Sequence, residues 1–441
     1  MKRKWMLVAA TVLAIVMAVS LGLVGCKTPT TTTAAAETAT AAETTAAAET
    51  TTKESGEVVE ISGLFWKGEA QEGMDALNQK FNELNPNIKV TVAIAAAYEQ
   101  TLQGRISAGD PPDLIGIRAG NYSLYIIEGG NVMDLTGQPF LSNVRDDILK
   151  AQTYDGKVWY LPIDAAAVGC IYNKKVYSDL NLSVPKTWDE FIKNCDAIKA
   201  AGIIPVVYPG ADSWTLLQAL CAFAAPLVYG PDPDFDIHAV RDGTKSYAGP
   251  EWTKALDYYT QVRDNYANKD FNSLNYATAN QMMASGEAAM AMQGIWDVAA
   301  IQSVNPDADL GFFIPPTADT PLLILGSDFA FGVSSVTKHK TEALKYLDYL
   351  TSKDAYEIWT SKVKTISTMK GSPMDFDSVV KDVQSIIDSG VKTYPLLNHG
   401  WFNMSADADI PTLLQSYNLG DLSSADTLKT LGDIITAAYK K

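Results

Sequence analysis

The chain has 441 residues and a formal net charge of −16. This acidic balance disfavours nucleic acid and anionic lipid headgroups as partners. The length exceeds that of one ordinary hydrophobic core and favours two domains. Apart from Cys26, the cysteines are Cys170, Cys195 and Cys221, without the paired spacing of a metal site. We expect three buried thiols rather than a disulfide framework.

The N-terminus has the pattern of a secretory signal. Lys2, Arg3 and Lys4 precede an apolar run over Trp5–Val24, and a small-residue cleavage site follows. A retained transmembrane anchor is the alternative, because the run is nearly long enough to span a bilayer. Leu-Val-Gly before Cys26 resembles the bacterial lipobox. We therefore predict a signal peptide over residues 1–25 and a lipidated Cys26 that anchors the protein to a membrane surface.

A low-complexity segment follows the cysteine. Residues Thr28–Thr52 are almost only Thr, Ala and Glu, with no large apolar side chain. Such a segment cannot bury enough surface to offset the entropy of ordering it, so we predict a disordered tether over residues 26–56. An anchor, a tether and a folded body together describe a protein displayed just outside a membrane.

The folded body begins with alternating strand and helix patterns. An apolar run over Val58–Phe65 precedes a helix with Met74, Leu77, Phe81 and Leu84 on one face, and the strand pattern Ile88–Ile94 follows. A second helix around Leu102–Ile106 leads into the apolar run Leu114–Ile117. This order predicts an α/β fold with a mostly parallel sheet.

Local signals mark helix starts and one hairpin. Asn173 is a good N-cap for a short helix, and Thr187 with Glu190 forms a capping-box pattern. Asp155-Gly156 lies between two strand-like pieces and favours a tight hairpin. Further predicted helices are Trp252–Tyr266 and Glu342–Leu350.

Five sequence blocks resemble extracellular solute-binding proteins of carbohydrate ABC transporters. They occur in the order and spacing seen in that family, and the resemblance covers nearly the whole chain after the tether. The blocks are SAGDPPDLIGI, GGNVMDLT, YDGKVWYLPIDAAAVGCIYNKKVYSDLNLSVPKTWDEF, GEAAMAMQGIWDVAAI and EALKYLDYLTSKDAYEIW.

The resemblance implies a two-lobed periplasmic-binding-protein-like fold of type II, with lobes that close on a ligand. It implies chain crossings near 163–166, 307–310 and 351–355. The N-terminal lobe would comprise 57–163 plus 310–352, and the C-terminal lobe 164–309 plus 353–441.

The ligand site is expected in the interlobe cleft, where strands end. A sugar needs aromatic planes for its C–H faces and planar hydrogen-bonding groups for its hydroxyls. Trp66 and Glu69 end the first strand, although Trp66 could instead cap the core. Trp296 follows Gly294 and resembles the family's stacking tryptophan, with a core position as the alternative. Trp401, in HGWFN, resembles an aromatic residue of the last cleft loop.

Other candidates have equally plain structural alternatives. Arg118, Asn121 and Tyr122 follow a strand and face the cleft or cap the next helix. Asp164, at the first crossing, contacts ligand hydroxyls or makes a hinge hydrogen bond. The remaining candidates are Trp214 and Asp328, each after a strand, and Tyr98, for which stacking and packing are both open.

A glycosidase and a binding protein for a non-sugar solute are the alternative function classes. A glycosidase needs two carboxylates placed across one bond, which sequence spacing cannot exclude. However, the chain has only three histidines, no His-Glu-x-x-His, no Gly-x-Ser-x-Gly and no phosphate-binding glycine loop. The same fold could bind a polyamine, a peptide or a metal chelate, but a mixture of Arg, Asn, Asp and Trp favours a neutral polyol.

These observations predict a substrate-binding lipoprotein of an ABC importer, not an enzyme. It would capture a sugar, in our prediction an oligosaccharide, and deliver it to a two-subunit permease. We expect a monomer without cofactor or metal, held by its lipid anchor on the outer face of the bacterial cell membrane.

Overall fold

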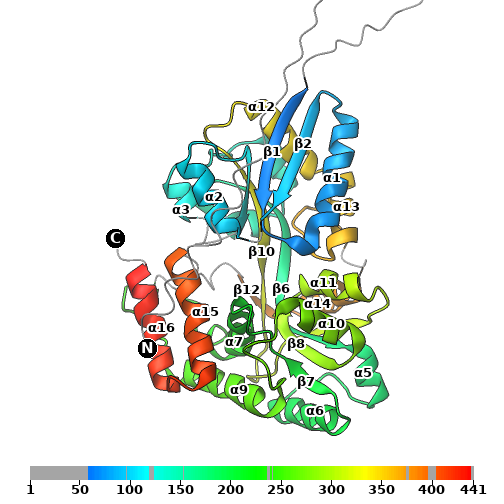
Figure 1. Cartoon of the computed structure of the whole chain (residues 1–441), viewed down its shortest axis with the longest axis vertical. Coiled ribbons are helices and arrows are strands. Elements are labelled where there is room, and N and C mark those ends of the chain that lie inside the picture. Colours follow the sequence, from blue (N-terminus) through cyan, green and yellow to red (C-terminus); the bar gives the residue numbers. More distant parts are fainter. Residues whose placement is uncertain are drawn as a thin grey trace, which may run out of the picture. The chain divides into compact units, whose positions relative to one another are not determined.

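The computed structural model describes residues 58–95, 97–118, 124–151, 153–235, 239–240, 242–373, 377–395 and 404–438 (Figure 1). The predicted signal peptide, the lipidated cysteine and the tether lie outside these ranges. Within them, no helix combines the length and the apolar character needed to cross a membrane.

The first elements form the predicted β-α-β unit. They are β1 (Val59–Phe65), α1 (Gln71–Leu84), β2 (Ile88–Ile94), α2 (Tyr98–Ser107) and β3 (Leu114–Arg118). β1 lies between β2 and β3 and is parallel to both. α1 buries Met74, Leu77 and Phe81 on one face, as their helical spacing predicts. We call this set of strands and its covering helices the first lobe.

Two long strands connect this set to a second one. They are β6 (Leu161–Asn173) and β10 (Leu322–Val333), which pair with each other. β10 also pairs with β3, whereas the far half of β6 pairs with β8 (Ala288–Gly294) and β9 (Leu310–Phe313). β7 (Ile204–Val207) is parallel to β8. We call the elements around β7, β8 and β9 the second lobe.

The sheet is mixed, with the order β2-β1-β3-β10-β6-β8-β7. Its two ends are parallel, but β3-β10, β10-β6 and β6-β8 are antiparallel. The prediction of a mostly parallel sheet is therefore wrong at the centre. The cause is the pair of long strands, which run in opposite directions between the two parallel sets (Figure 1).

The remaining elements cover these strands or connect them. They are η1 (Gly68–Ala70), α3 (Leu124–Glu128), η3 (Pro139–Asn143), α4 (Asp146–Ala151), β4 (Thr153–Tyr154), β5 (Lys157–Val158), α5 (Lys174–Asp179), α6 (Trp188–Ala200), α7 (Trp214–Val228), α9 (Pro250–Tyr266), α10 (Tyr276–Ser285), α11 (Asp297–Val304), α12 (Lys340–Leu350), α13 (Lys353–Val363), β11 (Ile366–Ser367), α14 (Ser378–Asp388), β12 (Lys392–Tyr394), α15 (Met404–Leu419) and α16 (Ser424–Ala438).

Two segments pack with the lobe opposite to the one predicted. β9, at 310–313, pairs with Cys170–Asn173 of the second lobe. α13 packs on α1 of the first lobe, where Lys362 forms an ion pair with Glu72. These contacts favour later crossings, at a bulge of β10 near Asp328 and at β11, in place of 307–310 and 351–355. The predicted first crossing lies inside β6.

The local signals act largely as predicted. Asn173 caps α5 by accepting a hydrogen bond from the Val176 amide at 3.1 Å. Thr187 caps α6 through the Glu190 amide at 3.2 Å, but the Glu190 carboxylate accepts from the Lys186 amide rather than from that of Thr187. The hairpin between β4 and β5 has positive φ at both turn residues, 52° at Asp155 and 70° at Gly156.

The three cysteines of the body are free and buried, as predicted. Cys170 lies in β6, Cys195 in α6 and Cys221 in α7. Burial raises the pKa of all three thiols, so they are protonated and unreactive at neutral pH.

The Asn173 cap provides a test of the fold. Its side chain also donates to the Met283 carbonyl at 3.1 Å, so it ties β6 to α10 as well as starting α5. Asn173→Ala removes both hydrogen bonds inside the protein and should lower the free energy of unfolding by about 2 kcal/mol. Urea unfolding measures this change. Thr187→Ala, at an exposed cap, is the matched control and should cost about 1 kcal/mol; equal costs would contradict the role of the Met283 contact.

Candidate functional site

Trp66 directly follows β1 and lies beside Phe329 of the long strand β10. Trp66 is half-buried, and its ring lies 5.4 Å from Tyr98 and 5.6 Å from Phe329, edge-on to both. The Arg118 guanidinium lies 4.8 Å from the centre of the same ring. Two predicted site residues, Trp66 and Arg118, are therefore in contact, and Arg118 also pairs with Glu99 at 3.6 Å.

Tyr98 packs in the first lobe, which answers the question that its sequence left open. Its side chain is buried, and its hydroxyl donates to the Gly116 carbonyl of β3.

Asp164 is fully buried and fully hydrogen-bonded. Its Oδ1 accepts from the Phe329 amide at 2.9 Å. Its Oδ2 accepts from Trp359 Nε1 at 3.1 Å and Thr365 Oγ1 at 3.1 Å, and lies 3.3 Å from Lys67 Nζ. Burial raises its pKa, and the charge of Lys67 opposes that rise. This arrangement corresponds to the hinge alternative, because both carboxylate oxygens already bind groups of the protein.

Asp328 lies inside β10, not at the end of a strand as the sequence suggested. It occupies a β-bulge between Ser327 and Phe329, where the register with β6 shifts. Its Oδ2 binds Lys67 Nζ at 2.6 Å, and its side chain retains 17% exposure.

Three aromatic residues of the second lobe form a cluster. The Trp214 ring lies 5.2 Å from Tyr276 and 6.4 Å from Trp296. Trp214 is 37% exposed and Trp296 only 8%, so the cluster has an accessible side and a buried side. Gly294 precedes Trp296 because a Cβ there would overlap the indole ring. The cluster offers the flat apolar surface that a sugar face requires.

Polar atoms beside this cluster are buried without a hydrogen-bond partner among the described residues. They are Gln293 Oε1, Trp296 Nε1 and Asp297 Oδ1. Buried polar atoms are nearly always paired in folded proteins, because an unpaired one loses its bond to water without compensation. Two acceptors and one donor beside exposed aromatic surface indicate a place for a ligand with hydroxyl groups.

Two carboxyl groups, one from each lobe, approach the same place. Burial raises the pKa of Asp297, at the start of α11, to about 7, and the negative charge of Glu69 contributes. Burial also raises the pKa of Glu69, in η1, although Lys67 opposes the shift. Tyr276 interacts with Asp297, and its own pKa is raised by burial and by both carboxylates. Glu69 thus interacts electrostatically both with Asp297, beside the aromatic cluster, and with Lys67.

Three of the predicted site residues are not among those that the structure describes. Asn121, Tyr122 and Trp401 lie outside the described residues. Four further side chains belong to the candidate site although the sequence did not single them out, namely Lys67, Tyr276, Gln293 and Asp297. Asp297 directly follows Trp296 at a helix start, and that adjacency was a usable signal. Tyr276 lies far from any recognised block, and only its contact with Trp214 reveals it.

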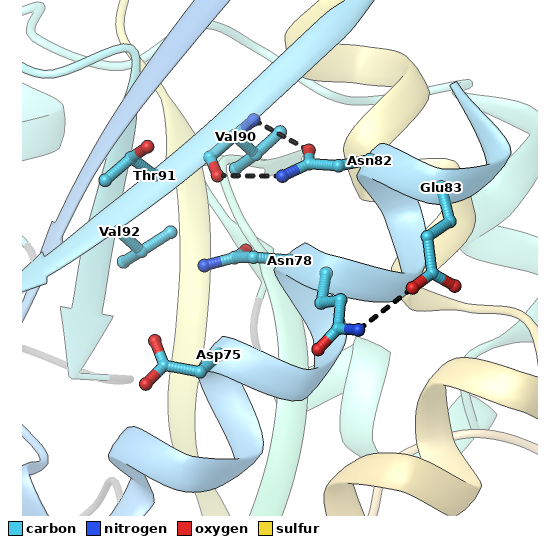
Figure 2. Close-up of a pocket in the computed structure, with 8 residues that line it drawn as sticks. Asp75, Asn78, Asn82, Glu83, Val90, Thr91 and Val92 are labelled. Carbon is cyan, nitrogen blue, oxygen red and sulfur yellow. Dashed lines mark hydrogen bonds between the residues drawn. The ribbon is translucent and has the colours of Figure 1, made fainter. Parts of the chain in front are cut away.

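A hollow of about 570 Å³ between α1 and β2 shares no residue with this site. Figure 2 shows its polar lining, in which the Asn82 amide faces the main chain of Val90. Asn82 accepts from the Val90 amide at 2.9 Å and donates to its carbonyl at 3.5 Å. Because β2 is an edge strand, this side chain covers backbone groups that could otherwise pair with another chain.

The sequence profile of the bacterial extracellular solute-binding proteins matches residues 66–357. The chain belongs to this family. The multiple sugar-binding protein of Streptococcus mutans is 27% identical over 344 residues, which cover 74% of this chain and 80% of that protein. The diacetylchitobiose binding protein DasA of Streptomyces coelicolor is 28% identical over 275 residues, 59% of this chain and 60% of DasA.

Solved structures of this family share the fold. RafE in complex with raffinose superposes with a TM-score of 0.75 at 24% identity, over 87% of this chain and 100% of that one. The apo form of RafE from Streptococcus pneumoniae gives a TM-score of 0.69 at the same identity, over 87% of this chain and 99% of that one. The predicted type II two-lobed α/β fold is confirmed. Among the described residues, no group of three His, Cys, Asp or Glu side chains is arranged to hold a metal ion.

The raised pKa of Asp297 predicts a pH-dependent stability. Its pKa is about 7 in the folded protein and 3.8 ordinarily, so the folded state holds a proton that the unfolded chain releases. The stabilising contribution is complete below about pH 4 and is lost as the pH rises through about 7. The free energy of unfolding should therefore fall less between pH 4 and pH 7 in Asp297→Asn than in the original protein, by more than about 1 kcal/mol.

Chemical unfolding between pH 4 and pH 8, without ligand, measures this effect. Asp189→Asn, in the exposed first turn of α6, is the matched control and should leave the profile unchanged. A profile of Asp297→Asn that parallels that of the original protein would show that this carboxyl titrates normally.

Proposed function

We propose that this extracellular solute-binding protein captures a sugar, most simply an oligosaccharide, for an ABC importer. The observation that carries the proposal is the aromatic cluster with its unpaired polar atoms. Trp214 supplies an accessible ring, and Trp296 Nε1 and Asp297 Oδ1 lack partners among the described residues. Relatives whose names specify sugar binding support the same ligand class.

The proposed contacts follow from the chemistry of each side chain. C–H faces of the sugar would stack on Trp214 and Trp296, and its hydroxyls would pair with Gln293 and Asp297. From the first lobe, Glu69, Arg118 and Asp328 would complete the hydroxyl contacts, beside Trp66. Asn121, Tyr122 and Trp401 remain predicted contacts.

Closure of the lobes would accompany binding. β6 and β10 run through both lobes, so rotation between the lobes must bend the chain near Asp164 and the bulge at Asp328. A ligand that touches Glu69 from one lobe and Asp297 from the other would favour the closed arrangement, because it gains the second set of contacts only there.

The ligand itself is expected to be neutral. Carboxyl groups beside aromatic rings could also suit a polyamine, which is the competing ligand class. However, burial raises the pKa of both Glu69 and Asp297 and so weakens their preference for the charged form, and the positive charge of Lys67 already acts on Glu69. A polyol matches that pair better. We propose binding without chemistry, in keeping with relatives that are named as binding proteins rather than enzymes.

The cellular setting follows the N-terminal segment. Cys26 would carry the lipid anchor and residues 26–56 would act as the tether, so that a monomeric body samples the space outside the cell membrane. The sugar-loaded form would dock on the two permease subunits. The membrane contact would be made by the lipid alone.

Calorimetric titration with raffinose, stachyose, diacetylchitobiose and spermidine tests the ligand class. At least one sugar should bind, and spermidine should not. Trp214→Ala should weaken sugar binding by about 5- to 150-fold, the equivalent of ~1 to 3 kcal/mol for one aromatic contact. Its melting temperature should change little because the ring is partly exposed.

The buried ring of Trp296 is the informative comparison. Trp296→Ala should weaken binding and also lower the melting temperature, since both the sugar contact and core packing are lost. If both variants bind sugars as tightly as the original protein, the aromatic cluster is not the ligand site. Binding of spermidine alone would replace the sugar by a polyamine.

Cys26→Ala tests the anchor. The variant should remain an uncleaved precursor or leave the membrane fraction, because no other residue can carry the lipid at that position. Metabolic labelling with a radioactive fatty acid and cell fractionation measure both outcomes. Cys221→Ala, at a buried thiol, is the matched control and should keep its label. Lipid labelling that persists in Cys26→Ala would refute the proposed anchor.

A further inference from the structure

Two ion pairs of the described residues meet at one buried cation. Lys67 follows β1 and is almost completely buried, with Nζ 2.6 Å from Asp328 Oδ2 and 3.3 Å from Asp164 Oδ2. Burial by itself would lower the pKa of Lys67, but the two carboxylates outweigh it and raise the pKa. The ammonium group is therefore charged and fixed between β6 and β10, the two strands that connect the lobes.

The two carboxylates that bind Lys67 differ in how many further hydrogen bonds they can accept. Asp164 is saturated by donors from β10, α13 and the segment before β11, in addition to Lys67. Asp328 makes its one hydrogen bond to Lys67, through Oδ2, and no described residue binds Oδ1. Its side chain is also the partly exposed one of the pair. The buried Lys67 ammonium thus holds the Asp328 carboxylate in place, and Oδ1 of that carboxylate can still accept a hydrogen bond.

The backbone around Asp328 is fixed as well. The Phe329 amide donates to Asp164, and the bulge interrupts the ladder between β10 and β6 at this residue. Asp328 therefore departs from the regular strand geometry, and its direction depends on the Lys67 ammonium. A carboxylate on a regular strand would not need such support.

We infer that Lys67 is a positioning residue for ligand capture, which holds the Asp328 carboxylate so that its second oxygen accepts a hydroxyl of the bound ligand. The inference rests on the proposed function for the identity of the ligand as a polyol. Lys67 itself does not touch the ligand. It acts through Asp328, and Asp164 keeps the cation in place from the other side.

Four variants separate this role from a merely structural one. Lys67→Met removes the cation, Lys67→Arg retains the charge, Asp328→Asn removes the charge of the oriented carboxylate, and the double variant combines Lys67→Met with Asp328→Asn. Lys89→Met is the matched control, because Lys89 forms an exposed ion pair with Glu60, 3.0 Å long, in the same lobe. Each protein is titrated with raffinose, stachyose and diacetylchitobiose at a temperature at which it is folded.

Lys67→Met and Asp328→Asn should each weaken sugar binding by about tenfold or more, the loss expected for a charge-assisted hydrogen bond. The double variant should bind as weakly as Asp328→Asn alone, because Lys67 acts only through that carboxylate. Lys67→Arg should recover part of the affinity, and Lys89→Met should bind normally. If Lys67→Met does not fold, Asp328→Asn alone decides the question, because normal sugar binding by that variant would show that the Asp328 carboxylate accepts no ligand hydroxyl.

Two results would overturn the inference while the proposed function stands. One is a folded Lys67→Met that melts at a lower temperature but binds the sugar with the original affinity. The other is a double variant whose loss of affinity is the product of the two single losses. If the original protein binds none of the three sugars, the proposed function fails, and the positioning role fails with it.

Discussion

The buried carboxylate of Asp164 determines how the segments between the lobes meet. It lies near the start of β6, and a buried charge is tolerated only when it is paired and hydrogen-bonded. Its partners come from four places in the sequence, namely Lys67 after β1, Phe329 in β10, Trp359 in α13 and Thr365 before β11. One side chain therefore gathers every described segment that passes between the lobes.

The same constraint places the proposed ligand site. Holding the end of β1 against β6 and β10 fixes the position of Glu69, two residues after Lys67, and the charge of Glu69 raises the pKa of Asp297. The second lobe brings its aromatic cluster to the start of α11, beside Glu69. A short stretch of chain, from Lys67 to Glu69, connects the crossing strands to the proposed site. A movement of one should therefore shift the other.

The sequence predicted those features that depend on neighbours along the chain. The β-α-β order, the Asn173 cap and the hairpin turn at Asp155-Gly156 each need only nearby residues, and all three are present. The mixed centre of the sheet was missed because strand direction depends on pairing over more than a hundred residues. Lys67 and Tyr276 were missed for a similar reason, since burial and distant partners give each its role.

The unpaired polar atoms explain how such a site can be selective. Trp296 Nε1 and Asp297 Oδ1 have no hydrogen-bond partner among the described residues, and in the proposed site the hydroxyl groups of a ligand would supply one. An apolar molecule of the same shape would cover the rings but would leave these atoms unpaired, so the site rejects it more strongly than contact area alone suggests. In the proposed site, aromatic surface would therefore provide affinity for many ligands, whereas the buried polar atoms would restrict them to polyols whose hydroxyls lie in the matching positions.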